Sequence, residues 1–114
     1  MRYYKTIDVH MTIDVVDRNL KIMPLLFVIL LENAFKHGVE NLRQDAYIDI
    51  NLLATKNAIN FDIENNFDPE EIRENIGIGL NNLKKRLDLV YPNLHQLKII
   101  TKKNSYRAQL SLEI

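Results

Sequence analysis

Apolar residues alternate with polar or weakly polar ones in five separate stretches of this chain. In the first stretch, every second position is apolar, at Ile7, Val9, Met11, Ile13 and Val15. That period is typical of a half-buried β-strand. Strands with one apolar face favour a mostly antiparallel sheet with helices on a single face, an α/β two-layer sandwich.

The other four alternating stretches occur in pairs, each pair around a short turn sequence. Residues 48–52 and 59–63 flank the polar residues 55–57, and residues 97–99 and 108–114 flank residues 103–105. Two strands that follow each other across so short a connection pair in antiparallel fashion. The sequence therefore predicts two β-hairpins, and residues 17–19 predict a further turn.

Three segments have the signals of helices. Pro24 suits a first helical turn and Gly38 suits a left-handed cap, which predicts a buried helix from Pro24 to His37. An apolar stripe with helical spacing predicts a second helix from Gly79 to about Val90. Asp68 is a good N-cap before a proline and two glutamates, which predicts a short helix over residues 69–73.

Composition limits the function classes. The chain has 114 residues, 46% of them hydrophobic, and no linker or repeat, so we expect a single domain over residues 1–114. Fifteen basic and 15 acidic residues balance, so we expect no nucleic-acid partner. Cysteine is absent. The longest apolar run, residues 25–31, is far shorter than the roughly 20 residues that span a bilayer, so we expect no direct membrane contact.

The segment Glu32-Asn33-Ala34-Phe35-Lys36-His37-Gly38 contains the first candidate site. On a helix, Asn33, Lys36 and His37 project on one side. An asparagine carbonyl can ligate Mg²⁺, which takes its other ligands from phosphates and water, and a lysine can offset phosphate charge. The alternative interpretation is structural: a satisfied polar group in a core helix, a surface lysine and a histidine near a helix C-terminus.

The segment Gly77-Ile78-Gly79-Leu80-Asn81-Asn82 contains the second candidate site. Gly77 and Gly79 allow the backbone to approach an anion closely, and the N–H groups that open the following helix point toward it. The alternative is a flexible loop before an ordinary helix. All three glycines of the protein lie at the ends of the two predicted long helices, which favours the phosphate-binding interpretation.

In this order, the two segments resemble the N box and the second glycine box of the histidine kinase ATP-binding domain, a member of the GHKL ATPase superfamily. Sensor kinases of the LytS type are the closer resemblance. This chain shares with them a proline, an apolar run and Glu-Asn-Ala-x-Lys-His-Gly, from Pro24 to Gly38. It also shares Gly-Ile-Gly-Leu-x-Asn followed by Arg-Leu and Tyr-Pro, from Gly77 to Pro92. The resemblance covers the chain from about Ile7 to its end, and implies the Bergerat fold of these ATPases.

The resemblance implies that the domain binds ATP and Mg²⁺. Asn33 would ligate the magnesium ion, and Lys36 and His37 would lie near the phosphates. The turn from Gly77 through Ile78, Gly79 and Leu80 to Asn82 would bind phosphate through its backbone, and the Asn82 side chain would assist.

The adenine-binding position departs from the family pattern. Most of the superfamily has Asp-x-Gly-x-Gly after the central strand, whereas this strand ends in Glu64-Asn65-Asn66-Phe67. Asn65 shares the strand face of Phe61 and Ile63, so we expect Asn65 to accept the hydrogen bond from adenine. A neutral acceptor contributes about 0.5–1.5 kcal/mol against about 1.5–3 for a charged one, which predicts roughly tenfold weaker affinity. The alternative is that residues 65 and 66 form a turn.

Glu32 is the remaining catalytic candidate, together with Asn33 and Lys36. Adjacent helix positions diverge by about 100°, so Glu32 does not share the face of Asn33 but could reach the site from its edge. In gyrase-type relatives the catalytic base lies one turn before the asparagine, where this chain has Ile29. ATP hydrolysis of that kind is therefore not expected.

The resemblance implies an excised catalytic domain of a protein-histidine kinase. Its partners would be the phosphoacceptor dimerisation helix of the same parent protein and a downstream response regulator of the LytTR type. None of His10, His37 and His95 has the Pro-His-Phe context of the phosphoacceptor, so the domain should not autophosphorylate alone. The parent would be an inner-membrane sensor with this domain in the cytoplasm.

Two alternatives remain open at this point. One has the same fold, an anti-sigma-factor serine kinase, although the Glu-Asn-Ala-x-Lys-His-Gly and Tyr-Pro signatures favour a LytS-like kinase. The other is a degenerate GHKL module, a pseudokinase that acts in protein–protein interaction. Two features support the pseudokinase alternative. The usual adenine-binding aspartate is absent, and the segment between Phe67 and Ile76 is short, which limits closure over ATP.

Overall fold

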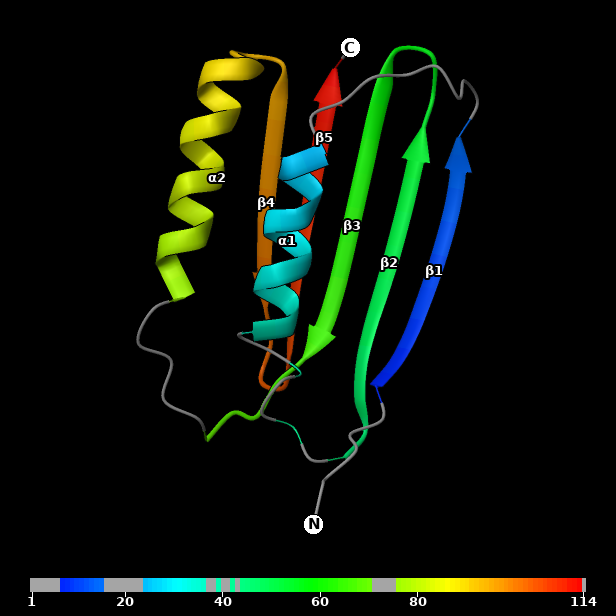
Figure 1. Cartoon of the computed structure of the whole chain (residues 1–114), viewed down its shortest axis with the longest axis vertical. Coiled ribbons are helices and arrows are strands. Elements are labelled where there is room, and N and C mark those ends of the chain that lie inside the picture. The colour runs from blue at the N-terminus through cyan, green and yellow to red at the C-terminus, as the bar shows by residue number, and fades with distance from the viewer. Residues whose placement is uncertain are drawn as a thin grey trace.

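The chain folds into two layers, a β-sheet and a pair of helices on one of its faces (Figure 1). The computed structural model describes residues 7–15, 24–36, 39, 42, 44–70 and 76–113. Within these residues there are five strands and two helices: β1 (Ile7–Val15), α1 (Pro24–Lys36), β2 (Ala46–Ala54), β3 (Ala58–Asn66), α2 (Ile76–Val90), β4 (His95–Thr101) and β5 (Ser105–Glu113). The predicted α/β two-layer sandwich is confirmed.

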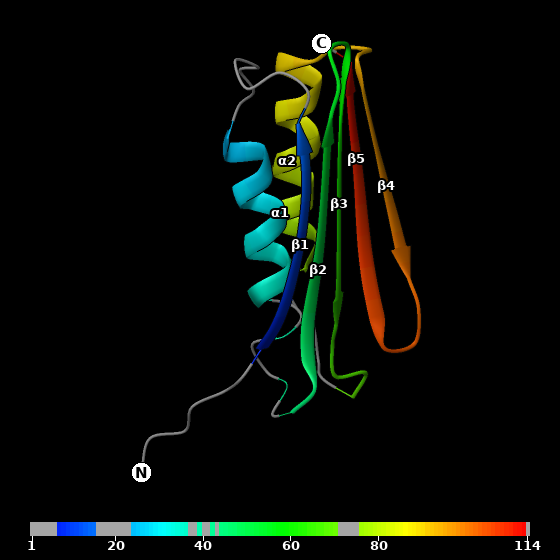
Figure 2. The same ribbon diagram turned by 90° about the vertical axis from the view of Figure 1, so that its right-hand side faces the viewer.

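The strands form one mixed sheet in the order β1-β2-β3-β5-β4. Strands β1 and β2 are parallel, because the chain between them passes through α1 before it returns to the sheet. The other three pairs are antiparallel, so the sheet is mostly antiparallel as predicted. Seen from the side, both helices lie against the same face of the sheet (Figure 2).

Both predicted hairpins are confirmed. Strands β2 and β3 are joined by a tight turn in which the Thr55 amide donates to the Ala58 carbonyl at 2.8 Å. At the β4–β5 turn, the Lys102 amide donates to the Ser105 carbonyl at 2.8 Å. Ser105, predicted in the turn, is the first residue of β5.

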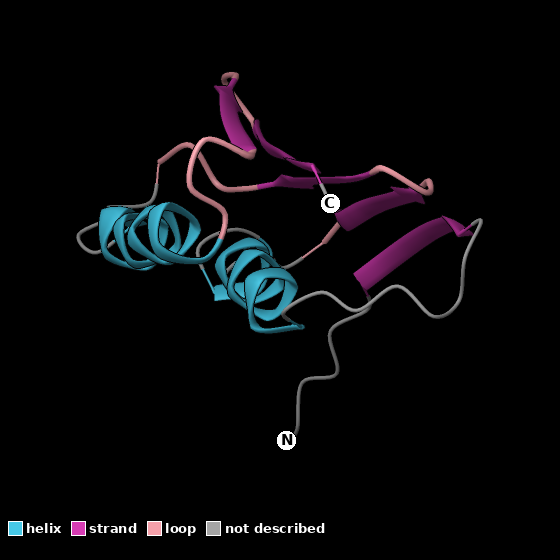
Figure 3. Cartoon of the chain, turned by 90° about the horizontal axis from the view of Figure 1, so that it is seen from above, coloured by secondary structure: helices cyan, strands magenta, loops and turns pink. Residues whose placement is uncertain are grey.

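The prediction that the first strand is half-buried holds only at its two ends, where Ile7 and Val15 pack against the core, and is wrong for its middle. Val9, Met11 and Ile13 are 55%, 57% and 57% exposed. Their register beside Ile48, Ile50 and Leu52 of β2 places them on the helix-covered face of the sheet. However, α1 packs on β3 and α2, and β1 is an edge strand that lies beyond the helices (Figure 3). The alternation therefore identified the strand but not its burial.

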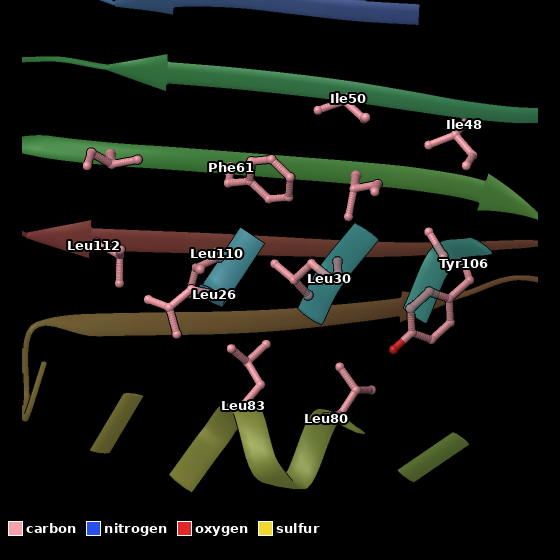
Figure 4. Packing of buried hydrophobic residues seen from close by; sticks show 14 of the residues in the cluster. Leu26, Leu30, Ile48, Ile50, Phe61, Leu80, Leu83, Tyr106, Leu110 and Leu112 are labelled. Atoms are coloured by element: carbon pink, nitrogen blue, oxygen red, sulfur yellow. The ribbon is translucent and has the colours of Figure 1, made fainter. Parts of the chain in front are cut away.

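An apolar layer joins the helices to the sheet (Figure 4). The side chains of Leu26 and Leu30 on α1 and of Leu83 and Leu87 on α2 are 0–1% exposed. The ring of Phe27 also stacks on that of Phe61, with the centroids 4.7 Å apart. Apolar surface removed from water in this layer is the main contribution to the stability of the fold.

The predicted starts and ends of the helices differ from the structure in one case. Helix α2 begins at Ile76, not at Gly79, so Gly77 and Gly79 are helical. Burial of Leu80, Leu83 and Leu87 on the same helix offsets the cost of about 1 kcal/mol for each glycine in a helix.

Other predicted local features fall partly or wholly outside the described residues. Helix α1 is described from Pro24 to Lys36, and residues 37 and 38 lie outside. The turn predicted at residues 17–19 lies outside as well. Pro69 and Glu70 form a turn, in which the Glu70 amide donates to Asp68 Oδ1 at 2.9 Å, and residues 71–73 of the predicted short helix are not described.

The outer face of the sheet is mostly polar and contains an ion pair between neighbouring strands. Arg107 on β5 donates from Nε to Asp62 Oδ1 on β3 at 2.9 Å, and also donates from its Nη2 to Asp62 Oδ2. Gln109 Nε2 donates to the same carboxylate at 3.3 Å. These hydrogen bonds, that from Arg107 above all, hold the pKa of Asp62 below its usual value.

A core substitution should separate buried from exposed leucines on the same helix. Leu83 is 0% exposed and Leu89 is 81% exposed, both on α2. Leu83→Ala should lower the free energy of unfolding by about 2–5 kcal/mol, because it leaves a cavity in the apolar layer. Leu89→Ala should change it by less than about 0.5 kcal/mol. Urea denaturation followed by circular dichroism measures both, and equal effects would contradict the two-layer packing.

The Asp62–Arg107 pair should make stability depend on pH. Because the pKa of Asp62 is lowered by folding, its carboxylate stabilises the fold above its ordinary pKa of about 4, and this contribution is lost as the pH falls through the lower folded-state pKa. Asp62→Asn should therefore cost about 0.5–1 kcal/mol at neutral pH for this part-exposed pair, and less in acid. Asp49→Asn, on the same face of β2, is the control. A cost that stays constant with pH would contradict this account.

Candidate functional site

The ends of three elements meet at one end of the molecule. The C-terminal end of α1, the C-terminal end of β3 and the N-terminal end of α2 all lie at the lower end in Figure 1. Asn33 is in the last turn of α1, Asn65 is the last residue but one of β3, and Gly77 and Gly79 are in the first turn of α2. The fold therefore brings Asn33, Asn65 and the first turn of α2 to the same end.

Asn33 is a buried polar residue in the apolar layer. It is 8% exposed, and its Oδ1 atom has no hydrogen-bond partner among the described residues. A buried carbonyl oxygen without a partner costs about 1–3 kcal/mol, so such a group calls for an explanation. A carbonyl oxygen on a rigid helix fits Mg²⁺, which accepts few protein ligands and completes its octahedron with phosphate and water oxygens.

Glu32 and Lys36 form an ion pair on the exposed side of α1. Lys36 Nζ lies 2.8 Å from Glu32 Oε1, and the two side chains are 59% and 55% exposed. Glu32 is thus exposed while its neighbour Asn33 is buried, as the helical geometry predicts. An exposed pair of this spacing contributes only about 0.3–0.5 kcal/mol, so Lys36 could exchange the carboxylate for a phosphate oxygen at little cost.

Asn65 is buried on the helix-covered face of the sheet, 2% exposed. Phe61 and Ile63 are buried on the same face, as strand parity predicts, and Asp62 points to the outer face, where it pairs with Arg107. Asn65 Nδ2 donates to the carbonyl of Asn66 at 3.0 Å. No hydrogen bond among the described residues uses its Oδ1, so this atom can accept one from a ligand.

The Asn66 side chain joins the end of β3 to the start of β2 through hydrogen bonds, a role that the sequence did not reveal. Its Oδ1 accepts from the Tyr47 amide at 2.9 Å, and its Nδ2 donates to the Asp45 carbonyl at 2.7 Å. Asp45 has a φ of 57°, in the left-handed region that aspartate tolerates better than most residues. The partners of Asn66 lie about twenty residues earlier in the chain, and the only sequence signal was the Asn65-Asn66 pair, which also fits a turn.

Tyr106 is a second residue that the sequence analysis did not single out. It lies directly opposite Asn65 on β5 and is 8% exposed. Its ring points into the layer between sheet and helices (Figure 4). Side chains directly opposite on neighbouring strands are about 5 Å apart, so an aromatic surface adjoins the Asn65 amide. The alternation of Ala108, Leu110 and Leu112 on β5 could have indicated this position, because Tyr106 is two residues before Ala108.

The glycine segment has a different shape from the one predicted. A turn was expected from Gly77 to Asn82, but these residues belong to α2, which begins at Ile76. The N–H groups of the first helical turn lack helical acceptors and carry partial positive charge, so the candidate phosphate site becomes the N-terminus of α2. The Leu80 side chain packs in the core and that of Asn82 is exposed. His37 lies outside the described residues.

The described part of the chain has neither a cluster of metal-ligating side chains nor a membrane-spanning helix. Its His, Asp and Glu residues form no group of three or more that could hold a metal ion, so a divalent cation near Asn33 would depend on ligand oxygens. Neither described helix is long and apolar enough to cross a membrane.

No protein-family model and no curated protein matches the sequence. Solved structures do match the fold. The nucleotide-free catalytic domain of histidine kinase ThkA is 13% identical, with a TM-score of 0.68 over 94% of this chain and 80% of that one. The cytoplasmic segment of histidine kinase QseC is 22% identical, with a TM-score of 0.57 over 95% of this chain and 62% of that one.

A further match is ThkA in complex with its response regulator protein TrrA. There the identity is 16% and the TM-score 0.62, over 94% of this chain and 34% of that one. At these identities the similarity is one of fold: a five-stranded mixed sheet with helices on one face, as in histidine kinase catalytic domains. The predicted fold class is confirmed by these neighbours.

The two buried asparagines should respond in opposite ways to replacement by leucine. Asn33→Leu removes an oxygen without a partner and should raise the free energy of unfolding by about 1 kcal/mol. Asn65→Leu removes a hydrogen bond to the Asn66 carbonyl and should lower it by about 0.5–1.5 kcal/mol. Urea denaturation without added ligand measures both. Destabilisation by Asn33→Leu equal to that by Asn65→Leu would show that Asn33 has a structural role instead.

Proposed function

We propose that this chain is the ATP-binding catalytic domain of a sensor histidine kinase. It would hold Mg-ATP at the end where α1, β3 and α2 meet and present the γ-phosphate to a phosphoacceptor histidine on a separate dimerisation domain. The observation that carries the proposal is the buried Oδ1 of Asn33, without a partner among the described residues, at the same end as the buried Asn65. The shared fold with histidine kinase catalytic domains supports it.

Each residue at this end has a chemical task in the proposal. Asn33 Oδ1 would be the one protein ligand of the magnesium ion, which when bound neutralises charge on the phosphate oxygens. Asn65 Oδ1 would accept a hydrogen bond from the adenine amino group, with the Tyr106 ring beside it. The first-turn N–H groups of α2, from Ile76 to Gly79, would donate to phosphate oxygens. Lys36 would leave Glu32 and add a positive charge.

No general base is needed on this domain for the proposed reaction. The attacking atom is an imidazole nitrogen of the acceptor histidine, so catalysis depends on position and on charge stabilisation. Ile29, one turn before Asn33, cannot activate a water molecule. Glu32 could orient Lys36 or the incoming histidine from the exposed side of α1. The domain alone should therefore bind nucleotide without hydrolysing it quickly.

The partners and the setting follow from the same proposal. The structure of ThkA with TrrA supports a response regulator as the downstream partner. The motifs Glu-Asn-Ala-x-Lys-His-Gly and Tyr-Pro favour a LytS-type kinase and hence a regulator of the LytTR type. The matched QseC structure is a cytoplasmic segment, which supports a cytoplasmic position for this domain in a membrane sensor.

A second candidate function rests on the exposed apolar residues of β1. Val9, Met11 and Ile13 form an uncovered strip on the edge strand, which is unusual for a surface that contacts water alone. A degenerate module that has lost useful ATP binding could use such a strip to bind another protein. The asparagine in place of the usual adenine-binding aspartate is the other support.

Calorimetric titration with a non-hydrolysable ATP analogue tests the proposal. The wild-type domain should bind in the micromolar to sub-millimolar range and require Mg²⁺. Asn33→Ala should weaken binding by about tenfold or more, since removal of one ligand or of its support typically costs that much. Asn51→Ala, on the exposed outer face of β2, should leave it unchanged.

The outcome separates the two candidate functions. No binding at millimolar nucleotide by a folded wild-type domain would overturn the kinase proposal and favour the interaction module. Magnesium-dependent binding that Asn33→Ala leaves unchanged would move the metal site away from α1.

A further inference from the structure

We infer that Asn66 is a positioning residue that makes the proposed nucleotide site selective for adenine over guanine, because it fixes the orientation of the Asn65 amide. The inference rests on the proposed function and adds the base specificity of the same site. The two neighbouring asparagines at the end of β3 would then act together: Asn65 would contact the base, and Asn66 would hold the Asn65 amide in its orientation.

The orientation of the Asn65 amide matters because an amide group has both a hydrogen-bond acceptor and a donor. An aspartate at the base-contacting position can only accept a hydrogen bond when ionised, whereas an asparagine can accept through Oδ1 or donate through Nδ2. Adenine has an amino group at C6, a donor, and guanine has a carbonyl there, an acceptor. An asparagine that is free to rotate by 180° about its last bond would therefore bind both bases.

In this chain the Asn65 amide is not free to rotate. Its Nδ2 donates to the carbonyl oxygen of Asn66 at 3.0 Å. The rotated amide would place Oδ1 against that carbonyl, so that two acceptors would face each other at hydrogen-bond distance. Asn65 is 2% exposed, so water could not relieve the repulsion. The observed hydrogen bond therefore leaves Oδ1, an acceptor, for the base.

The Asn66 carbonyl is held in place on the β2 side by the Asn66 side chain. Its amide accepts from the Tyr47 N–H at 2.9 Å and donates to the Asp45 carbonyl at 2.7 Å, so both of its ends bind the start of β2. The left-handed backbone of Asp45, with a φ of 57°, belongs to this connection. On the other side, Asn66 pairs with Ser105 of β5. The end of β3 is thus fixed from both neighbouring strands.

Loss of the Asn66 side chain removes one of these two attachments. The Asn66 carbonyl would then be held from the β5 side alone, through the Phe67 amide of the same peptide, which donates to the Asn104 carbonyl at 3.0 Å, and it could shift away from Asn65 Nδ2. The Asn65 amide would be able to present either end to the base. The consequence is specific: affinity for a guanine nucleotide should rise relative to that for an adenine nucleotide, which a loss of general stability would not cause.

The test is calorimetric titration of the domain with Mg²⁺ and non-hydrolysable analogues of ATP and of GTP. The wild-type domain should prefer the ATP analogue by about tenfold or more, the discrimination typical of well-placed hydrogen bonds to a base edge. Asn66→Ala should reduce this preference to less than about threefold. Asn60→Ala is the matched control, because Asn60 accepts from Ser111 Oγ at 2.8 Å on the exposed face of the same strand. It should keep the wild-type preference.

A second variant tests whether the changed preference in Asn66→Ala comes from the Asn65 amide or from a general loss of folding. In the double variant Asn65→Asp with Asn66→Ala, the ionised side chain has no N–H to donate, so the preference for the ATP analogue should return. Circular dichroism checks that each variant is folded.

The outcomes distinguish this inference from the function on which it rests. Equal binding of both analogues by the wild-type domain, or an unchanged preference in Asn66→Ala, would overturn the inference while the nucleotide site stands. No binding of either analogue by the folded wild-type domain would overturn the proposed function, and the inference with it.

Discussion

The apolar layer between the two helices and the inner face of the sheet determines where the polar site residues lie. Leu26 and Leu30 fix the rotation of α1 about its axis, because both are almost fully buried. With that rotation fixed, Asn33, three residues after Leu30, must also face the sheet. The same applies on β3, where the burial of Phe61 and Ile63 turns Asn65 inward. The core therefore forces two amide groups into a region that would otherwise be apolar.

The two amides satisfy their hydrogen-bonding needs in different ways, and the difference suggests their tasks. Asn65 uses its donor within the protein and keeps an acceptor for a ligand, whereas the acceptor of Asn33 has no partner among the described residues. In the proposed function, a fold that tolerates this cost would gain a ligand for Mg²⁺ on a rigid helix. Stability and binding would then be opposed at Asn33, which is common for residues of binding sites.

Much of the fold could be predicted from the sequence, because strand alternation and helix periodicity are local signals. The five strands, the two hairpins and the face of Asn65 are correct for this reason. Burial of β1 could not be predicted, since it depends on where α1 packs. Neither could the start of α2 at Ile76, because glycine propensity alone disfavours a helix at Gly77 and Gly79. The role of Asn66 depends on Asp45 and Tyr47, which only the folded chain brings near it.

The most direct test of the account is to map nucleotide binding on the domain by NMR. Titration with Mg²⁺ and a non-hydrolysable ATP analogue should shift the backbone amide signals of Asn33, Asn65, Gly79 and Tyr106. The β2–β3 turn and the α2–β4 connection, at the opposite end of the molecule in Figure 1, should not respond. Shifts confined to that opposite end or to β1, or no shifts at saturating nucleotide, would contradict a nucleotide site where α1, β3 and α2 meet.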